Sequence, residues 1–438
     1  MSSLTYREIF GKLVRSAYDG NIEEEIQYLN PDGSEVVNRY VKHAAGRGES
    51  GKIIFKVRDC RQETDCRENE CQAACLFNAI TKDEKGNVVI DDECCTTCGE
   101  CVEACKYDSL IDKKEFIPIV ELLKNKKAPV YAIVAPAFIG QFGEHVTPGK
   151  LRAALKRLGF YGMVEVALFA DMLTLKEALE FDTHVQQEGD FVLTSCCCPL
   201  WVAMIKKVYQ DLVPHISPSV SPMVACGRGV KKMHPEAKVV FIGPCIAKKA
   251  EAKEKDVKDA VDVVLTFQEI AQIFEVLGIK PEEMEDDERE HSSNAGRIYA
   301  RTGGVSEAVT LTLERIRPDR EMKIITAQAN GVKECRKLLQ DALDQKIEAN
   351  FYEGMGCLGG CIGGPKVRID PGQAAELVDE YGKAAESATP ADNKYVLELL
   401  KVLGYQEISE LLEGRKANLF KRNFAPTLKE TLPPPERH

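Results

Sequence analysis

The sequence predicts an α/β protein preceded by a small, cysteine-rich α+β domain. Two observations lead to this prediction. After Lys113, strand-like and helix-like segments alternate along the chain, which is typical of parallel sheets covered by helices. Before Lys113, nine of the 17 cysteines gather in two groups between Cys60 and Cys105. A third observation concerns function: three consecutive cysteines, Cys196 to Cys198, follow a short apolar segment.

At 438 residues the chain is too long for one ordinary hydrophobic core. Hydrophobic residues make up 44% and charged residues 29% of the chain, as in globular proteins. We expect four parts. They are an N-terminal helical segment over 1–55, a cysteine-rich domain over 56–115, a larger α/β domain over 116–378 and a C-terminal helical appendage over 379–438.

Charge and hydropathy exclude several classes of partner. The net charge of −11 argues against nucleic acid or an anionic membrane as the main partner. No apolar run reaches about 18 residues, so we expect no membrane span. The first residues lack the apolar core of a signal peptide, which predicts a cytoplasmic location. In such a chain, 17 cysteines favour metal ligation over disulfides.

The cysteines before Lys113 have the spacing of iron–sulfur ligands. The second group, with the bacterial ferredoxin spacing Cys-x2-Cys-x2-Cys-x3-Cys, consists of Cys95, Cys98, Cys101 and Cys105. The first group, a stretched version, consists of Cys60, Cys66, Cys71 and Cys75. In ferredoxins the fourth cysteine of each group crosses to the other cluster. This predicts one 4Fe-4S cluster on Cys60, Cys66, Cys71 and Cys105, and another on Cys95, Cys98, Cys101 and Cys75. Zinc, the alternative, prefers more widely separated Cys-x2-Cys pairs.

Beyond these cysteines the alternation of elements can be assigned segment by segment. We expect strands over 87–91, 130–134, 163–169, 192–193, 238–242, 261–265 and 322–326. We expect helices over 148–158, 172–187 and 267–277, one beginning near Val332, and one in the tail over 395–400.

Three later motifs each place cysteines in a loop. They are Thr194–Trp201, which contains the triple cysteine, then Gly243–Lys249, then Glu353–Pro365. The first two follow strands, and strand ends are where α/β folds build their sites. One cysteine from each of the first two motifs and a Cys-x3-Cys pair from the third make four thiolates. A cubane iron–sulfur cluster needs four.

Together these motifs resemble the catalytic domain of the iron-only (FeFe) hydrogenases. That family carries TSCCP-x-W, PC-x-x-K-K-x-E and E-x-M-x-C-x-G-G-C motifs in this order, matched here at 194–201, 244–251 and 353–361. The resemblance runs from about Ala128 to Pro365, and the ferredoxin-like segment before it is a familiar accessory module. It implies two α/β lobes with an H-cluster buried between them. In the family, the H-cluster is a cubane bridged to a di-iron unit with CO, cyanide and an azadithiolate.

The extra cysteine leaves two registers for the first motif. Counting back from Pro199 makes Cys198 the ligand and Cys197 the free thiol, whereas counting forward from Thr194 moves both roles by one. The upstream acidic pair and the downstream serine fit the family without a gap only in the first register. By resemblance the cubane ligands are therefore Cys198, Cys245, Cys357 and Cys361, with Cys361 bridging to the di-iron unit.

The same resemblance makes Cys197 the proton relay. A thiol with a reference pKa of about 8.5 can exchange a proton near neutral pH without binding iron. Its implied partners are Glu177, Ser217 and Glu180. By spacing alone, the two carboxylates, three residues apart on a helix, would indicate only a solvated helix face.

Further residues of the site follow from the resemblance alone. Lys248 would donate to a cyanide ligand, although without its motif it would be assigned to the surface. Residues that would line the pocket are Ala135, Pro136, Pro222 and Met355. Cys226 and Cys335 belong to no motif, so we interpret them as buried structural thiols. Cys94 and Cys196 receive no role.

The chain departs from the common family pattern at several positions. Gly243 stands where many members have methionine, Tyr299 and Ala300 replace a commoner Phe-Gly, and the loop after Cys361 is short. With the triple cysteine, these features resemble the divergent group B branch.

The sequence thus predicts a hydrogenase that interconverts protons, electrons and H2. Two 4Fe-4S clusters would pass electrons to an external carrier such as ferredoxin, and maturation proteins would deliver the di-iron unit. One alternative is a hydrogen sensor, a class that tends to lose the relay cysteine and to add a PAS-type domain. A second is a cytosolic iron–sulfur assembly factor, a class without the di-iron unit.

Overall fold

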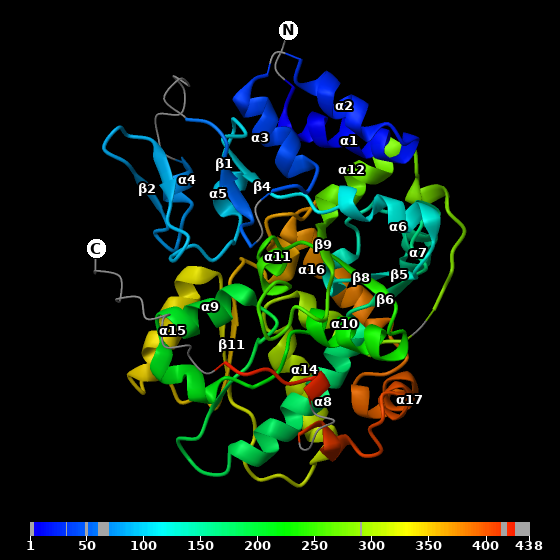
Figure 1. The fold of residues 1–438 in the computed structure, drawn as a ribbon. Coiled ribbons are helices and arrows are strands. Elements are labelled where there is room, and N and C mark those ends of the chain that lie inside the picture. Colours follow the sequence, from blue (N-terminus) through cyan, green and yellow to red (C-terminus); the bar gives the residue numbers. More distant parts are fainter. Residues whose placement is uncertain are drawn as a thin grey trace.

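Two parallel β-sheets with helices packed around them make up most of the molecule, as the computed structural model shows (Figure 1). The structure describes residues 4–31, 33–48, 51–59, 70–289, 291–412 and 418–424. The predicted α/β class is confirmed, as is an antiparallel, cysteine-rich segment before it. Within the described ranges, no helix is long and apolar enough to cross a lipid bilayer.

The first sheet has four parallel strands in the order β6-β5-β8-β9. Their bounds are β5 (Val130–Val134), β6 (Gly162–Glu165), β8 (Lys238–Gly243) and β9 (Val263–Thr266). The central strands β5 and β8 are almost entirely buried, because helices cover both faces of the sheet. The helices that pack on it include α7 (Pro148–Leu158), α10 (Pro222–Met233) and α12 (Phe267–Leu277).

The second sheet has three parallel strands in the order β10-β11-β7. Their bounds are β7 (Val192–Leu193), β10 (Thr326–Asn330) and β11 (Phe351–Met355). The helices around it are α9 (Pro199–Lys207), α14 (Gly304–Ile316) and α15 (Val332–Leu343).

The strand predicted over 322–326 is wrong in position. The strand instead begins at Thr326 and ends at Asn330, where every residue pairs with β11. Its sequence, TAQAN, has little intrinsic strand preference, so pairing with the buried β11 decides its extent. The predicted pattern also missed β11, whose Glu353 and Gly354 interrupt an apolar run.

Helix α8 (Ala167–His184) lies between the two sheets and contacts α10, α13 (Asn294–Arg297) and α14. It is buried from Ala167 to Phe181, so its apolar residues show no helical periodicity. For this reason both its start and the preceding strand were predicted wrongly. The strand ends at Glu165, and the helix starts five residues before the predicted Met172.

Asp171 on α8 is fully buried and accepts hydrogen bonds from the backbone N–H groups of Ser293, at 2.7 Å, and Gly296, at 2.9 Å. Burial raises its pKa to about 7, although these bonds oppose the shift. Between about pH 4 and pH 7 the native state therefore holds a proton that the unfolded chain releases. We expect the free energy of unfolding of the wild type to fall across this window relative to that of Asp171→Asn. Urea unfolding of both proteins at pH 5 and pH 7.5 measures the difference, and a constant difference would contradict the expectation.

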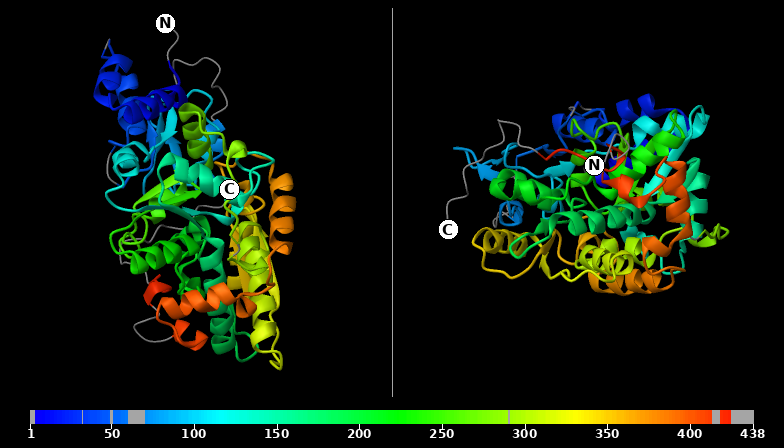
Figure 2. Two further views of the ribbon diagram at one scale, coloured as in Figure 1. Left: turned by 90° about the vertical axis from the view of Figure 1, so that its right-hand side faces the viewer. Right: turned by 90° about the horizontal axis from the view of Figure 1, so that it is seen from below.

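The N-terminal helices pack at the end of the molecule that contains the first sheet (Figures 1 and 2). Its helices are α1 (Tyr6–Asp19), α2 (Ile22–Leu29) and α3 (Glu35–Ala44). In the cysteine-rich segment that follows, β1 (Ile54–Lys56) pairs with β4 (Leu110–Asp112), and β2 (Ile80–Lys82) pairs with β3 (Val88–Ile90), both antiparallel. The two short helices of this segment are α4 (Glu70–Ala73) and α5 (Glu100–Glu103).

A buried ionic cluster joins the cysteine-rich segment to the first sheet. Lys249, fully buried on α11 (Ala247–Glu251), donates to Asp112 at 2.9 Å and to Glu269 at 2.7 Å. These carboxylates belong to β4 and α12, so one ammonium group ties three elements together. The cysteine-rich segment is thereby held against the α/β part.

The C-terminal helices pack along one side of the α/β region (Figure 2). Its helices are α16 (Pro371–Lys383) and α17 (Lys394–Val402). The segment 418–424 pairs with 218–220, because Val220 donates to the carbonyl of Phe420 at 2.9 Å and Arg422 donates to that of Pro218 at 3.0 Å. One apolar core joins the N-terminal helices, the first sheet and the tail. The four domain boundaries therefore stay a prediction.

Candidate iron–sulfur and proton-relay site

The loop with the triple cysteine connects β7 to α9. Trp201 on α9 donates from its indole Nε1 to the carbonyl oxygen of Thr194 at 2.9 Å and is fully buried. The indole packs directly on β11 at Gly354, where a Cβ would come within 2.0 Å of the ring. The close approach of Trp201 thus holds the cysteine loop against the second sheet, and only glycine leaves the room for it.

Within this loop, Cys198 is the residue before the first turn of α9, and its sulfur accepts a hydrogen bond from the N–H of Gly356 at 3.3 Å. The loop turns at Ser195, which has a φ of 62°. The hydroxyl of Ser195 is buried and meets no hydrogen-bond partner among the described residues. The first and third cysteine motifs are therefore in direct contact.

The other cysteine loops also leave the ends of parallel strands. Cys245 follows β8, and Cys357 and Cys361 follow β11. The backbone N–H of Lys366 donates to the carbonyl of Pro244 at 3.0 Å, which joins the second and third loops. Cys245, Cys357 and Cys361 are half-buried. Three loops from two sheets thus converge on one place.

Electrostatic interactions place the four predicted ligand thiols close to one another. Burial raises the pKa of Cys357, and negative charge at Cys245, Cys198 and Cys361 would raise it further. Burial also raises the pKa of Cys245 to about 12 and that of Cys361 to about 11, with Cys198 contributing to both. Without a metal these groups would remain neutral thiols at pH 7.

This donor set fits an iron–sulfur cubane. In the described part of the chain, no three Cys, His, Asp or Glu side chains lie close enough to hold a single metal ion. A cubane spreads its four thiolates over four separate iron ions, so it does not need such close spacing. The positive charge of iron would also stabilise the thiolate forms that burial disfavours. The four thiols therefore suit a cluster.

Cys197 and Lys248 lie beside these thiols. Burial raises the pKa of Cys197, and negative charge at Cys361 and Cys198 would raise it further, whereas the charge of Lys248 lowers it. The Lys248 ammonium is buried and donates to Glu251 at 2.5 Å. Burial alone would lower the pKa of Lys248, but Glu251 and the neighbouring thiols raise it, so the group stays cationic.

The thiol that hydrogen-bonds to Glu177 is Cys196. Its sulfur donates to Glu177 Oε1 at 3.4 Å, and the hydroxyl of Thr194 donates to the other carboxylate oxygen. The charge of Glu177 also acts on Cys197, through a weaker interaction. Burial raises the pKa of Glu177 to about 7, which lets the carboxyl exchange a proton near neutral pH. The sequence pattern did not indicate the contact with Cys196.

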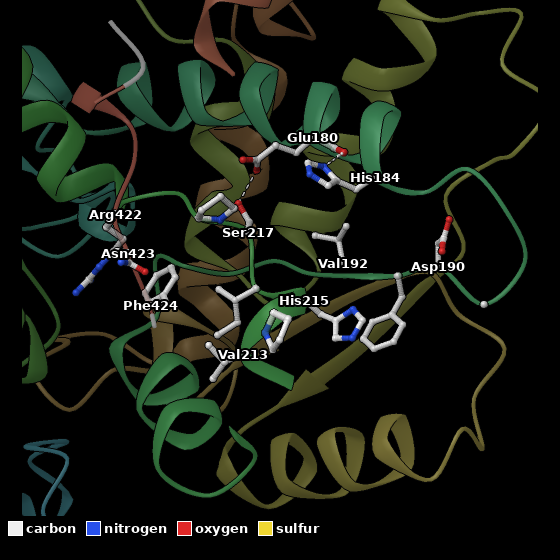
Figure 3. A pocket seen from close by; sticks show the side chains of 15 residues that line it. Glu180, His184, Asp190, Val192, Val213, His215, Ser217, Arg422, Asn423 and Phe424 are labelled. Atoms are coloured by element: carbon white, nitrogen blue, oxygen red, sulfur yellow. Dashed lines mark hydrogen bonds between the residues drawn. The ribbon is translucent and has the colours of Figure 1, made fainter. Parts of the chain in front are cut away.

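Glu180 lies one turn further along α8, and Ser217, from the segment before α10, contacts it. The Ser217 hydroxyl donates to Glu180 Oε2 at 2.6 Å, and the Ser217 N–H donates to the carbonyl of Leu193 in β7 at 2.9 Å (Figure 3). Both residues line a cavity of about 640 Å³. Its polar and charged lining also includes His184, Asp190, His215, Arg422 and Asn423 (Figure 3). The inner carboxylate, Glu177, is not part of this lining.

The residues predicted to line the pocket lie at or directly after the ends of β5, α10 and β11. Ala135 and Pro136 follow β5, and a Cβ on Gly243 would come within 3.2 Å of Ala135. Pro222 is the first residue of α10, and Met355 is the last of β11 and is buried. Their role as pocket walls stays a prediction.

The cysteine-rich segment brings together four further thiols. Burial raises the pKa of Cys98 to about 12, with further contributions from negative charge at Cys95 and Cys75. Burial is also the largest cause that raises the pKa of Cys101, and negative charge at Cys98, Cys95 and Cys75 would raise it further. These four are the set predicted for one cluster. For the other predicted set, Cys71 and Cys105 are described, whereas Cys60 and Cys66 lie outside the described residues.

This set lies next to the α/β loops. Gly99, with a φ of 91°, packs so closely on Ile246 that a Cβ would come within 2.4 Å of its side chain. Ile246 directly follows Cys245, and Gly99 directly follows Cys98. Glu100 acts electrostatically on both Cys98 and Cys357. The two cysteine sets are therefore neighbours across the boundary between the segments.

Glu353, in the third cysteine motif, accepts hydrogen bonds from the first residues of α14 and from Gly303 before it. It is fully buried, and its carboxylate accepts from the N–H groups of Gly303, at 2.8 Å, and Ser306, at 2.7 Å, and from the Ser306 hydroxyl at 2.6 Å. Glu353→Ala leaves these donors buried and unpaired, so we expect the free energy of unfolding to fall by about 2–4 kcal/mol. Urea unfolding measures the loss, and Glu353→Gln, which keeps an acceptor, should lose less. Equal stability of Glu353→Ala and wild type would contradict this role.

Comparison with known proteins supports a common origin. The family model described as "Iron only hydrogenase large subunit, C-terminal domain" matches residues 128–365. Iron hydrogenase 1 of Clostridium pasteurianum is 30% identical over 312 residues, which cover 60% of this chain and 54% of that protein. The NADP-reducing hydrogenase subunit HndD of Solidesulfovibrio fructosivorans is 28% identical over 479 residues, covering 93% of this chain and 77% of that protein.

Two further similarities bear on fold and on function. A solved structure of FeFe-hydrogenase HydA1 from Chlamydomonas reinhardtii matches with a TM-score of 0.53 and 21% identity, over 67% of this chain and 93% of that one, which supports the fold. The cytosolic Fe-S cluster assembly factor NAR1 of Yarrowia lipolytica is 26% identical over 160 residues, 32% of each protein. Because the hydrogenase family model covers more than half of the sequence, the chain belongs to the iron-only hydrogenase family of oxidoreductases.

Proposed function

We propose that this protein catalyses the reversible reaction 2 H⁺ + 2 e⁻ = H2 at an H-cluster. One observation carries the proposal. Four buried or half-buried thiols from three loops converge, with Cys197 and the Lys248 ammonium beside them. Four thiolates suit a cubane, and an unligated thiol with an adjacent cation suits proton exchange at a cofactor.

The proposed ligands of the cubane are Cys198, Cys245, Cys357 and Cys361, with Cys361 shared with the di-iron unit. When bound, the H-cluster supplies the redox chemistry of hydrogen. Lys248 contributes a buried cation, which Glu251 orients by accepting one of its three N–H donors at 2.5 Å. The remaining donors can bind an anionic group of the cofactor.

The proposed proton route runs from Cys197 through Glu177 and then Ser217 to Glu180. The pKa of about 7 at Glu177 supports a carrier role, because the carboxyl can both accept and release a proton at neutral pH. The cavity beside Glu180 supports an exit to solvent at the outer end. The contact of Cys196 with Glu177 is the feature that makes the assignment to Cys197 worth testing directly.

The proposed electron route uses two 4Fe-4S clusters in the cysteine-rich segment. The approach of Gly99 to Ile246 supports it, because this contact joins a cluster-binding loop to a loop of the active site. The proposed partners are a redox carrier protein such as ferredoxin and the maturation proteins that deliver the di-iron unit. Nucleic acid and membranes are not proposed partners, given the net charge of −11. A cytoplasmic location is proposed, since a reducing compartment suits a chain with 17 cysteines, most of them in metal-ligand spacing.

Two other functions remain as candidates. The similarity to an Fe-S assembly factor supports a scaffold that holds iron–sulfur clusters without a di-iron unit. A hydrogen sensor would use the same cofactor with slow turnover. The buried Lys248 and the carboxylates along α8 favour an enzyme, because a scaffold would need neither a cation nor a proton route at this place.

Infrared spectroscopy of the matured protein, combined with a hydrogen turnover assay, tests the proposal. We expect bands from iron-bound CO and cyanide together with rapid H2 production and uptake. Bands with negligible turnover would indicate the sensor. A protein that binds iron and sulfide but shows no such bands after maturation would indicate the scaffold and overturn the proposal.

A further inference from the structure

A buried lysine occupies the outer end of the proposed proton route. Lys176 on α8 is 0% exposed, and its ammonium forms an ion pair with Glu180 and donates to the hydroxyl of Ser219 at 2.7 Å. Burying an ammonium is costly unless it is paired and hydrogen-bonded. No motif singled out Lys176, and the function proposed above does not use it.

The partners of Lys176 form a closed ring of hydrogen bonds. Ser219 and Ser217 are 2.9 Å apart, and Ser217 donates to Glu180 at 2.6 Å. An ammonium can only donate, so Ser219 accepts from Lys176 and uses its single O–H toward Ser217. Ser217 then uses its own O–H toward Glu180. Every hydrogen bond in the ring points toward the Glu180 carboxylate.

Within the described part of the chain, the other charged and titratable groups near Glu180 form no ion pair with its carboxylate. On its own helix these are Glu177 and His184, and from neighbouring segments around the cavity they are Asp190, His215 and Arg422. The His184 ring contacts the Glu180 backbone carbonyl, at 2.8 Å, and not its carboxylate. Arg422 makes its ion pairs with Glu251, Glu254 and Asp256. Among the described residues, Lys176 is the one cation paired with the Glu180 carboxylate.

We propose that Lys176 is a positioning residue that pairs with the Glu180 carboxylate and orients the Ser217 hydroxyl toward it. This inference rests on the proton route proposed above. In this orientation an outward step breaks the Ser217 O–H bond as a Glu180 O–H bond forms, and Ser217 would regain a proton through the inner part of the proposed route. An inward step needs Glu180 to be protonated beside the Lys176 cation, and it needs Ser217 to turn toward Glu177. The ring therefore holds the Ser217 hydroxyl in position to donate its proton to Glu180.

Lys176→Met tests this in the matured protein through the pH profiles of H2 oxidation and H2 production. Without the ammonium, a buried Glu180 favours its neutral acid form, which can no longer accept a proton. We expect the acid limb of the oxidation profile to move up by at least about one pH unit. Lys176→Arg, which keeps the positive charge, should restore the profile.

Lys249→Met is the matched control, because Lys249 is equally buried and also paired with carboxylates, Asp112 and Glu269, but lies outside the route. It should lower stability without moving the acid limb. Should Lys176→Met fail to fold, Lys176→Gln removes the charge while keeping a donor and is expected to shift the limb in the same way. An unchanged profile in a folded, charge-free variant would overturn the proposal. Wild-type protein without CO and cyanide bands would instead reject the proposed function, so the two failures are distinct.

Discussion

Cys197→Ala is expected to lower hydrogen turnover at least about 100-fold while leaving the infrared bands of iron-bound CO and cyanide in place. The reason is that Cys197 lies among the ligand thiols and beside Lys248 but is not needed as a ligand in the predicted register. Alanine removes the thiol proton and leaves the four ligands intact. Turnover is measured by H2 production with a reduced dye, and the bands by infrared spectroscopy of the same sample.

Cys196→Ala is the matched control for this variant. It removes a neighbouring thiol of the same loop, which donates to Glu177 at 3.4 Å. In the predicted register, Cys196→Ala should keep most of the turnover. If Cys196→Ala stops turnover with the bands in place and Cys197→Ala loses the bands, the register is shifted by one residue. The proton then reaches Glu177 through the contact that the structure shows.

Cys357→Ala is expected to abolish the CO and cyanide bands and hydrogen turnover together. The variant removes one of four converging thiols, and a cubane lacking a ligand cannot anchor the di-iron unit. The proposed clusters of the cysteine-rich segment use separate thiols, so their paramagnetic signals should persist in the reduced protein. Iron analysis should show a loss of about six iron ions per chain, four from the cubane and two from the di-iron unit.

Cys335→Ala provides the control for a lost thiol. Cys335 is fully buried and near Cys198, and its thiol lies 3.5 Å from the carbonyl oxygen of Met355. Because no motif includes it, the substitution should cost some packing energy but no iron. Retention of the CO and cyanide bands in Cys357→Ala, or their loss in Cys335→Ala, would contradict the proposed ligand set.

Much of the site could be predicted from local patterns. Metal-ligand spacing survives in the sequence, because cysteines with two to five residues between them in one loop must reach the same cluster. The strands β5 and β8 were also predicted, because buried parallel strands form continuous apolar runs. For β10 and α8 local patterns were insufficient. Pairing with β11 decides where β10 begins and ends. Because α8 is buried on all sides, its sequence shows no amphipathic pattern that would mark its first residue.

By itself, the sequence determined which metal ligands this protein carries and which family its motifs match. Cysteine spacing indicated iron–sulfur ligands, and three motifs in order indicated the hydrogenase family, since both depend on residue type and separation along the chain. Only the tertiary structure decided which side chains meet. It brought Cys196 to Glu177, and Lys176 to Glu180 and Ser219. The thiol contact spans 19 positions and the Lys176–Ser219 contact 43, and such contacts depend on how α8 packs between the sheets, which no local pattern encodes.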